Sequence, residues 1–551
     1  MKKILFTTLL LSNLLFAQNY SEDFAQPLSI PVSLSANFAE LRANHFHAGL
    51  DIRTQQRTGL KIFATQDGYI SRINISPYGY GKAIYITHPN GYTTVYGHLS
   101  ELIAGVEKTR KEQYAKKSYT VDFYLQPDEI PVKQGDIIAL TGNTGGSGGP
   151  HLHFEVRDTK TEEILNPFLF GYELSDHVAP QVSGVWIYPL DGGKVNQSTN
   201  KVLAASSGNY LVSGSIGFGV KAYDKQDGSN NLNGIYSIKT YVNSELISTF
   251  QADRCSFDES RMINASIDYP EQISKNSWIY RTWILAGNTL PMYKQNVNRG
   301  ILKVKPDSVY NVRIEVGDFS GNITARMFTL KGEASGGYDS SDNLSNPAWV
   351  KYDTPFSFSK DEISLKFDKN SFYEDFDFSF KKISSKKYQI GSSSVPVQKR
   401  FELTFSPDTL DAEKKYNFVI MRESNFGKYK KEYLKTEYKN GKYTAYPRDF
   451  GNFSLVLDDV KPTISCPALA KSKKVQKRLG FIIKDSDSGI KTFDVFIDGK
   501  WILAEYEYKN NTLFIPDLAK EGIEQGQHQL EVTVTDEANN TQKYADNFEK
   551  L

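Results

Sequence analysis

Short runs of alternating or continuous apolar residues, separated by glycine-rich and asparagine-rich turns, fill the first third of the chain. The runs include KAIYITH (82–88), TTVYGHL (93–99) and DIIAL (136–140). The turns between them are PYGYG (77–81), HPNGY (88–92), KQGD (133–136) and GNTGGSGGP (142–150). Period-two alternation is typical of strands, and turns of this composition connect hairpins. The pattern predicts a β-sheet domain that extends to about residue 170.

One segment breaks this period. The sequence EKTRKEQYAKKSYTVDFYLQPDE (107–129) is highly charged and has no strand-like alternation over most of its length. We expect it to be a surface insertion or a lid on the β domain.

An internal repeat appears after residue 176. VAPQVS (178–183) resembles VKPTIS (460–465), 220–243 resembles 481–499, and VRIEVGDFSGNIT (312–324) resembles LEVTVTDEANNTQ (530–542). Short alternating strands with Asp, Gly and Asn turns are typical of β-sandwiches. Three paired segments in the same order predict two copies of one sandwich, which resembles bacterial immunoglobulin-like domains at the level of the fold.

The chain between the two copies has a different pattern. A tract rich in Gly, Ser and Asp at 332–347 is typical of a linker. The strand-like, aromatic sequence after it predicts a further β domain. The expected fold class is therefore all-β. The predicted divisions are a signal peptide (1–17), a β-sheet domain (25–170), a sandwich (176–331), a β-rich domain (346–455) and a second sandwich (456–551).

Length and composition agree with several separate cores. A chain of 551 residues is too long for one ordinary core, and about three to five domains are expected. Lys and Arg total 65 against 64 Asp and Glu, so nothing in the charge balance indicates nucleic acid or a strongly anionic partner. The two cysteines, Cys255 and Cys466, lie far apart in the sequence, and a disulfide between them is possible but not favoured.

The chain begins MKKILFTTLLLSNLLFAQNY, in which two lysines precede an apolar run. This pattern predicts a secretory signal peptide that is cleaved after about Ala17. The run is short for a transmembrane span, and no cysteine follows it to carry a lipid anchor. No later apolar run is long enough to cross a bilayer, so we expect a soluble protein in the periplasm or outside the cell.

Histidines are concentrated in the first domain. Six of the eight precede residue 154, namely His45, His47, His88, His98, His151 and His153. In HFHAGLD (45–51), His47 and Asp51 would be about 13 Å apart on a straight strand, too far to share an ion. A bend at Gly49, where glycine permits unusual φ angles, would bring them together.

The sequence HLH places His151 and His153 on one face of a strand, roughly 6 to 7 Å apart. Both could ligate one metal ion, or one could ligate it while the other reaches a bound water, and the spacing does not decide between these. His98 follows an apolar strand and faces a turn.

Two histidines and one carboxylate around an ion leave a fourth position open, which is typical of catalytic rather than structural zinc sites. Such a metal lowers the pKa of a bound water and polarises a carbonyl group. A further histidine could accept the proton of that water, and another could donate to a developing oxyanion.

HAGLD, YGHLS and GNTGGSGGPHLHFEVRD, in this order, resemble the lysostaphin/LytM-type zinc metallopeptidases of the M23 family, which hydrolyse peptidoglycan. The intervening strands and turns are also similar, so that the resemblance covers about residues 38–168. It implies that His47, Asp51 and His153 are the zinc ligands. It implies further that His151 is the general base and that His98 contacts the substrate or the oxyanion.

Two features depart from the family. The turn before His151 reads GGSGG where relatives usually have a Ser-Thr-Gly run, and the 107–129 insertion is longer than the usual hairpin. The second feature leaves specificity and basal activity open, because the insertion could cover the groove. The family has no role for His45 or His88, and we interpret both as structural or surface residues.

The resemblance implies a secreted endopeptidase that cuts peptide cross-links of peptidoglycan with a zinc-activated water. By analogy the expected bond is a D-alanyl–diamino acid cross-link. The alternative is a non-catalytic LytM-type cell-wall binder or an activator of another hydrolase.

Three further hypotheses have less support. An iron oxygenase also uses two histidines and one carboxylate, but its acid normally lies two residues from the first histidine. PVKQGDIIALTG (131–142) resembles the hairpins of biotinyl or lipoyl carriers, but no lysine stands at a hairpin tip in the expected setting. The β domains after residue 176 could instead carry the main function by binding glycan or an envelope protein, although we expect them to be spacers or docking modules.

Overall fold

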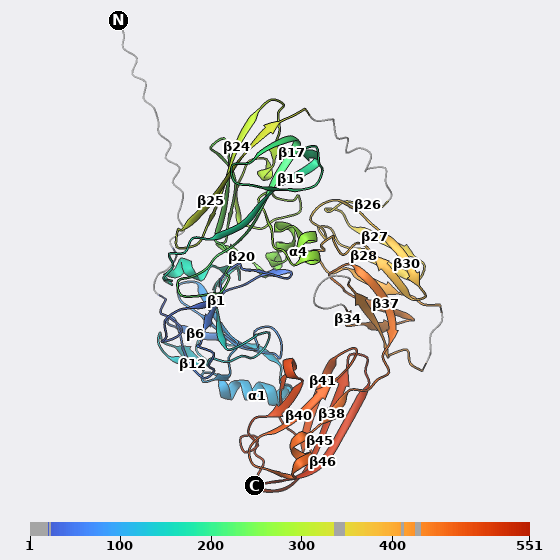
Figure 1. Ribbon diagram of the computed structural model, residues 1–551. Coiled ribbons are helices and arrows are strands. Elements are labelled where there is room, and N and C mark those ends of the chain that lie inside the picture. The colour runs from blue at the N-terminus through green and yellow to red at the C-terminus, as the bar shows by residue number, and fades with distance from the viewer. Residues whose placement is uncertain (1–19, 21–23, 173, 335–347, 409–412, 425–430) are drawn as a thin grey trace.

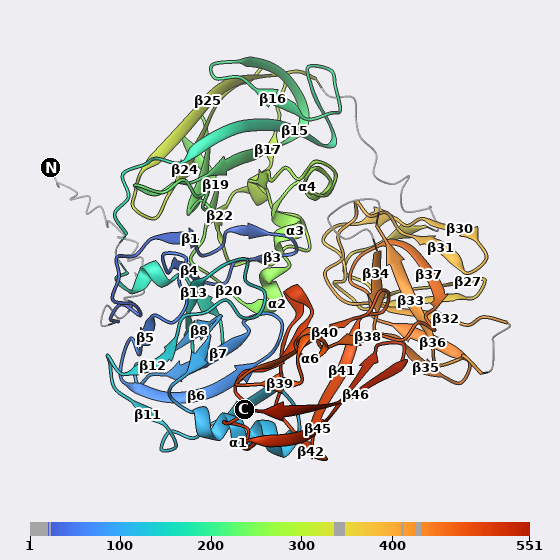
Figure 2. The same cartoon turned by 60° about the horizontal axis from the view of Figure 1, so that its bottom comes forward.

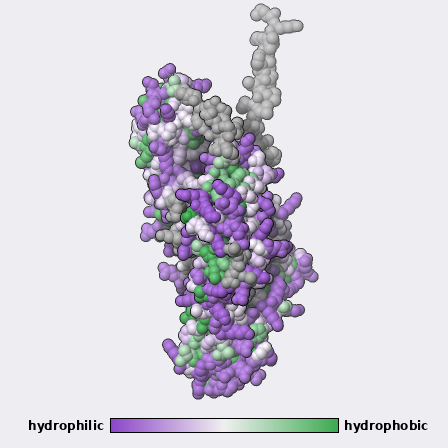
Figure 3. Space-filling view, turned by 90° about the vertical axis from the view of Figure 1, so that its right-hand side faces the viewer, coloured by the Kyte–Doolittle hydropathy of each residue, from purple (hydrophilic) through white to green (hydrophobic). Residues whose placement is uncertain are grey.

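The computed structural model describes residues 20, 24–172, 174–334, 348–408, 413–424 and 431–551. The expected signal peptide (1–17) and most of the expected linker at 332–347 lie outside these residues. Figure 1 shows four β-rich bodies in chain order, and Figure 2 shows the last of them lying beside the first. The face of the molecule in Figure 3 is mostly polar, with apolar side chains in small scattered groups.

The first body is built on a large sheet whose main path runs β1-β4-β13-β8-β7-β6-β10. These strands are β1 (Leu34–Ala36), β4 (Leu50–Arg53), β6 (Gly68–Ile75), β7 (Lys82–Thr87), β8 (Tyr92–Gly97), β10 (Val121–Tyr124) and β13 (His151–Asp158). Smaller strands are β2 (Leu41–Arg42), β3 (His45–Phe46), β5 (Lys61–Phe63), β9 (Glu101–Leu102), β11 (Pro131–Val132), β12 (Ile137–Leu140) and β14 (Ile164–Leu165).

One core joins the large sheet to the three-stranded sheet β5-β12-β9. Ile84 and Phe154 of the large sheet belong to the same buried cluster as Ile62 and Ile138 of the small one. The continuous apolar runs in the sequence are the central strands, which are covered on both faces. β13 lies between β4 and β8, and six consecutive residues in it are buried.

The first repeat domain (176–332) holds ten strands in one hydrogen-bonded sheet. Its long strands are β15 (Gln181–Val195), β17 (Asn209–Tyr223), β18 (Ser237–Val242), β19 (Glu245–Gln251), β24 (Val309–Gly317) and β25 (Ile323–Gly332). The short strands are β16 (Val202–Ala204), β21 (Tyr280–Arg281), β22 (Tyr293–Asn296) and β23 (Leu302–Lys303). Parallel pairing of β17 with β25 joins the two halves, whose apolar side chains share one core.

The first repeat domain also carries short helices. They are α2 (Phe257–Ser260), α3 (Ile263–Ser266) and α4 (Tyr269–Lys275), and β20 (Arg254–Cys255) just before them pairs with β14. Cys255 and Cys466 are both free and buried.

The third domain (348–458) contains two five-stranded sheets and an aromatic-rich core. One sheet has β27 (Phe356–Lys360), β28 (Ile363–Phe367), β32 (Glu402–Phe405), β35 (Glu437–Lys439) and β36 (Lys442–Ala445). The other has β30 (Phe380–Ser384), β31 (Lys387–Ile390), β33 (Phe418–Glu423), β34 (Lys431–Leu434) and β37 (Gly451–Leu457).

The C-terminal domain (459–551) has a four-stranded and a five-stranded sheet around its own core. The first contains β38 (Thr463–Ser465), β40 (Leu479–Lys484), β43 (Glu505–Glu507) and β44 (Thr512–Ile515). The second contains β39 (Lys474–Val475), β41 (Ile490–Ile497), β42 (Lys500–Trp501), β45 (Gly526–Asp536) and β46 (Thr541–Lys550). The all-β expectation is confirmed across the four bodies. Within the described part of the chain, no helix has the length and apolar character that a membrane crossing requires.

The charged insertion 107–129 folds into helix α1 (Val106–Lys116) and strand β10. The helix packs against the C-terminal domain, as Figure 2 shows. Arg110 donates to the Glu521 carboxylate at 2.8 and 3.2 Å, Tyr114 donates to the same carboxylate, and the ring of Tyr114 lies 5.5 Å from that of Trp501. The insertion is therefore a platform for another domain.

A Glu521→Ala substitution tests this contact. The Glu521 side chain is almost fully buried between the two domains, so its loss leaves the Arg110 guanidinium without its partner. We expect the docking to weaken by about 1–3 kcal/mol, measured as faster amide hydrogen exchange in α1. Glu524→Ala, on the exposed surface of the same domain, is the matched control. Unchanged exchange in α1 of the Glu521 variant would contradict the docking role.

Candidate metal centre

Two neighbouring strands of the large sheet bring the candidate ligands together. β4 and β13 are antiparallel, and their register sets His153 directly opposite Asp51. His151 lies two residues earlier on β13, opposite Arg53, and Gly97 of β8 flanks His153 on the other side. Residues 102 positions apart in the sequence thus become cross-strand neighbours.

His47 joins this pair through a bend between β3 and β4. The expected bend at Gly49 is present, but its physical reason differs from the expected one. Gly49 does not have a positive φ; a Cβ atom there would lie 2.2 Å from the carbonyl oxygen of Phe154. Glycine is needed because the chain passes close to the backbone of β13.

The three candidate ligand atoms converge. His47 Nε2 lies 3.1 Å from Asp51 Oδ1 and 3.2 Å from His153 Nδ1, and His153 Nδ1 lies 2.8 Å from Asp51 Oδ1. All three residues are buried. They form one of the groups among the described residues whose donor atoms could hold a metal ion.

Hydrogen bonds on the far side of each ring fix which nitrogen is free. His47 Nδ1 lies 2.8 Å from the carbonyl oxygen of Asn37, and His153 Nε2 lies 2.9 Å from Glu155 Oε1. Both partners can only accept, so each of these nitrogens carries the proton. His47 Nε2 and His153 Nδ1 therefore both face the Asp51 carboxylate, where all three atoms could hold one cation.

A buried ionic network stands behind His153. Glu155 is fully buried, and it accepts hydrogen bonds from Arg157 Nε at 2.7 Å and from the hydroxyl of Tyr80. Burial alone would raise the pKa of Glu155, but Arg157 and His153 instead lower it to about 2. Glu155 therefore stays ionised and holds the His153 ring in place.

Neighbouring groups shift the pKa values of the candidate ligands Asp51 and His153. Burial would raise the pKa of Asp51, yet His47, His151 and His153 hold it well below its usual range. Burial would lower the pKa of His153, yet its hydrogen bonds to Asp51 and Glu155 raise it to about 9.

His151 and His98 lie beside the ligands. His151 Nδ1 is 2.8 Å from the carbonyl oxygen of Gly149, so Nδ1 carries the proton and Nε2 is free to accept one. The Nε2 atom is buried, lacks a hydrogen-bond partner among the described residues and lies 3.3 Å from Asp51 Oδ1. It is the unsatisfied acceptor of the site.

His98 follows β8 with a positive φ of 61°, which turns its ring toward His151 at 4.7 Å between ring centres. Its Nδ1 lies 2.8 Å from the carbonyl oxygen of Thr144. Burial, together with His153 and His151, lowers the pKa of His98 to about 3. All five candidate residues of the sequence analysis thus lie in one place, with His98 neutral.

The other two histidines of this domain have different surroundings. His88 is buried and bonds the carbonyl oxygen of Asp67 at 2.9 Å and the hydroxyl of Thr94 at 2.8 Å. His45 is exposed at the rim of the cleft. Neither contacts the three converging ligand atoms.

The five residues lie in a cleft of about 1140 Å³. Its wall includes Phe257, Ser260 and Arg261 of the first repeat domain and Arg448 of the third domain. No residue of the 107–129 insertion is among the lining residues, so the possible lid over the groove is not observed in the described structure. The C-terminal domain comes close instead, because Lys509 donates to the carbonyl oxygens of Asn143 and Ser147.

Sequence reasoning missed Glu155, Arg157 and the distant cleft wall. The period of β13 could have indicated the first two, because His153, Glu155 and Arg157 alternate on one face of the strand. The cleft wall carried no recognisable pattern, since Arg261 and Arg448 become neighbours of the site only through domain packing.

Comparison with known proteins agrees with this geometry. Residues 45–121 and 114–167 match the model of Peptidase family M23, and residues 347–458 match that of the Zu5-like domain. A metalloprotease of Haemophilus influenzae is 33% identical over 109 residues, covering 20% of this chain and 18% of that protein. DD-carboxypeptidase/endopeptidase Mpg of Neisseria meningitidis is 33% identical over 111 residues, 20% of each chain.

The matched part spans about a fifth of the length of these curated relatives. Among solved structures, the catalytic domain of the prophage-encoded M23 protein EnpA from Enterococcus faecalis has 25% identity and a TM-score of 0.21, covering 27% of this chain and 98% of that one. The family model matches the segments that carry all five site residues. The resemblance to the M23 metallopeptidases is thus confirmed for residues 45–167, which match the model of that family.

Proposed function

We propose that this protein is an exported, zinc-dependent endopeptidase that hydrolyses the peptide cross-links of peptidoglycan. The observation that carries the proposal is the convergence of His47 Nε2, Asp51 Oδ1 and His153 Nδ1 beside the unsatisfied acceptor His151 Nε2. The names of relatives such as the peptidoglycan DD-endopeptidase ShyB of Vibrio cholerae support the substrate class.

In this proposal His47, Asp51 and His153 hold a zinc ion. Two imidazole nitrogens and one carboxylate oxygen are a common ligand set of catalytic zinc. When bound, zinc supplies Lewis acidity that activates a water and polarises the scissile carbonyl. Glu155 and Asn37 orient the two imidazoles through their outer hydrogen bonds.

His151 acts as the general base. Its protonated Nδ1 is fixed on the carbonyl oxygen of Gly149, so the free Nε2 can take a proton from the attacking water. His98 is neutral in this structure, with its proton on Nδ1. Its ring lies beside that of His151, where it can contact the substrate.

The cleft suits a peptide with free carboxylates. Arg42, Arg53 and Arg448 are among its lining residues, and they would attract the acidic groups of stem peptides. By analogy with the relatives we infer a D-alanyl–diamino acid cross-link as the preferred bond.

The remaining assignments complete the proposal. A signal peptide of residues 1–17 would export the chain to the periplasm or the cell exterior. The domains of 176–331, 346–455 and 456–551 would act as spacers or docking modules for the peptidase domain of 25–170, and an envelope protein is a possible partner.

His151→Ala tests the base. Without an acceptor at Nε2, turnover of purified sacculi should fall by about 10²–10⁴-fold, while bound zinc is retained because His151 is not a ligand. Mass spectrometry of the released muropeptides measures the loss of cross-linked dimers, and His45→Ala at the cleft rim is the control. If the His151→Ala variant removed cross-linked dimers as fully as the unchanged protein and the His45→Ala control, His151 would not be the general base. No loss with any of the proteins would favour the activator alternative.

Glu155→Gln tests the support of His153. Glutamine keeps the shape but removes the charge, so the His153 ring is held less firmly and zinc affinity should fall by about 10- to 100-fold. Competition with a chromogenic chelator measures the affinity, and circular dichroism checks the fold, since Arg157 also loses its partner. Glu162→Gln on the exposed turn is the control. An unchanged zinc affinity would show that Glu155 has no such role.

A further inference from the structure

The two repeat domains each bring three aspartates together at one end. The first cluster is Asp176, Asp224 and Asp318, and the second is Asp485 and Asp536 of the C-terminal domain with Asp458 at the end of the third domain. Within each cluster, one carboxylate oxygen from each aspartate lies within 4.8 Å of those from the other two. The three positions are equivalent in the two repeats, because each falls in or beside one of the paired sequence segments.

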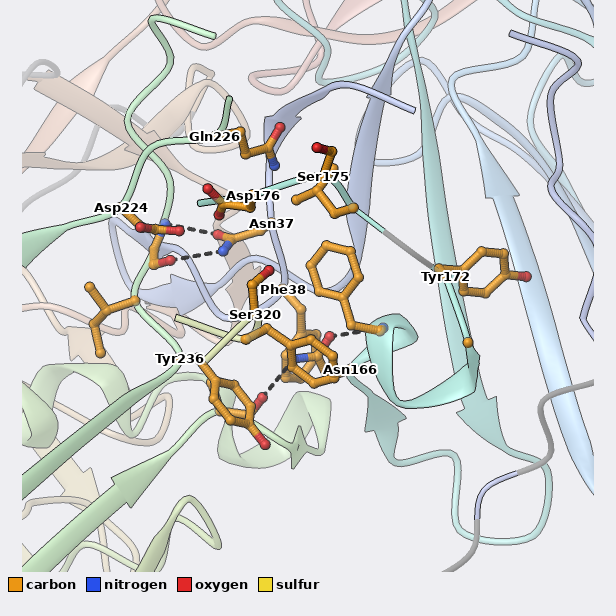
Figure 4. A pocket seen from close by; sticks show the side chains of 17 residues that line it. Asn37, Phe38, Asn166, Tyr172, Ser175, Asp176, Asp224, Gln226, Tyr236 and Ser320 are labelled. Carbon is orange, nitrogen blue, oxygen red and sulfur yellow. Dashed lines mark hydrogen bonds between the residues drawn. The ribbon is translucent and has the colours of Figure 1, made fainter. Parts of the chain in front are cut away.

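The first cluster joins three segments. Asp176 precedes β15, Asp224 follows β17 and Asp318 follows β24. Figure 4 shows Asp176 and Asp224 beside each other at a cavity of about 480 Å³ between the peptidase domain and the first repeat domain. The Asp224 side chain is only 5% exposed.

The second cluster repeats this plan. Asp458 follows β37 of the third domain and precedes β38, Asp485 follows β40, and Asp536 ends β45. Asp458 and Asp536 are buried, and Asp485 is half-buried.

The surroundings of the two clusters also match. Asn322 Nδ2 donates to the carbonyl oxygen of Asp176 and to Asp318 Oδ2, at 3.1 and 2.8 Å. Asn540 Nδ2 donates to the carbonyl oxygen of Asp458 and to Asp536 Oδ2, at 2.9 Å in both cases. These amides tie the aspartates of each cluster into one arrangement.

Each cluster retains an oxygen without a partner. Asp224 Oδ1 and Asp485 Oδ1 are both inaccessible to solvent and accept no hydrogen bond from the described residues. None of the six carboxylates forms an ion pair within the described part of the chain. Burial, together with Asp176 and Asp318, raises the pKa of Asp224 to about 8. The pKa of Asp536 is likewise raised, by burial and by Asp458 and Asp485.

Three buried carboxylates at such distances repel one another, and the free oxygens of Asp224 and Asp485 need a positive partner. Calcium binds six to eight oxygen ligands with flexible geometry, which carboxylates, carbonyls and water can supply. The clusters contain no histidine or cysteine, so their ligand chemistry does not match that of zinc or copper.

We propose that each cluster binds one calcium ion and that the ion fixes the junction at which its repeat domain begins. Asp176 lies on the segment that enters the first repeat domain from the peptidase domain, and Asp458 lies on the segment that enters the C-terminal domain from the third domain. Calcium ties each entering segment to the two loops of the domain that carry the other aspartates. Asn417 of the third domain supports the second junction through hydrogen bonds to Ala538 and Asn540.

The test is a calorimetric titration of the mature, zinc-loaded chain with calcium chloride after removal of free metal. Two equivalents should bind to the unchanged protein, one each to Asp224→Asn and Asp485→Asn, and none to the double variant. Asp307→Asn and Glu531→Gln, both exposed on the repeat domains, should keep two equivalents.

Thermal unfolding separates binding from a structural role. Calcium should raise the Tm of the unchanged protein, because it binds the folded state. Without calcium, Asp224→Asn should unfold near the same temperature as the unchanged protein, because the amide resembles the neutral carboxyl group that the raised pKa of Asp224 favours, and added calcium should shift its Tm less.

Three results would overturn the proposal. The first is that the unchanged protein binds no calcium up to about 10 mM, and the second is that the double variant still binds two equivalents. The third is that magnesium saturates the sites as tightly as calcium does. Zinc content and muropeptide release are measured on the same samples. They report on the peptidase site alone, because the calcium titration does not depend on either quantity.

Discussion

The register between β4 and β13 is the constraint on which the candidate site depends. A one-residue slip would turn His153 and His151 to the opposite face of the sheet, because side chains alternate along a strand. The register is held by the burial of Leu50, Ile52, Leu152 and Phe154 on the core face. The opposite face of the same two strands can then carry several polar and charged side chains close together. The buried core supplies the stability that offsets the unfavourable interactions among them.

The sequence predicted the features of this site that depend on residues close together in the chain. His47, Asp51, His98, His151 and His153 were singled out because their motifs are local features, and the structure brings them into one cleft; their chemical roles stay predictions. The reason for Gly49 could not be predicted, because it lies in the distance from that glycine to the carbonyl oxygen of Phe154 on another strand. The all-β fold followed from the period-two pattern, whereas α1 did not, because the 107–129 segment is polar on every side.

The repeated segments show a second limit of sequence reasoning. VAPQVS, VKPTIS and their companions were recognised as repeats, but the aspartates among them look like ordinary turn residues in the sequence. Only packing shows that Asp224 is buried and that one of its oxygens lacks a partner. The other cluster aspartates accept hydrogen bonds from nearby backbone N–H groups, as turn aspartates do, so the buried oxygen without a partner is what distinguishes the cluster.

Asn37 connects the two kinds of site in this molecule. Its backbone carbonyl accepts the hydrogen bond of His47 Nδ1, while its side chain exchanges two hydrogen bonds of 2.8 Å with Gly234, drawn as dashed lines in Figure 4. Gly234 follows Asn233, whose backbone bridges to Asp224. The loop that carries an aspartate of the first cluster therefore holds the residue that orients His47. This path of hydrogen bonds runs from the first cluster to the ring of His47, so the first repeat domain takes part in positioning one of the three candidate ligands.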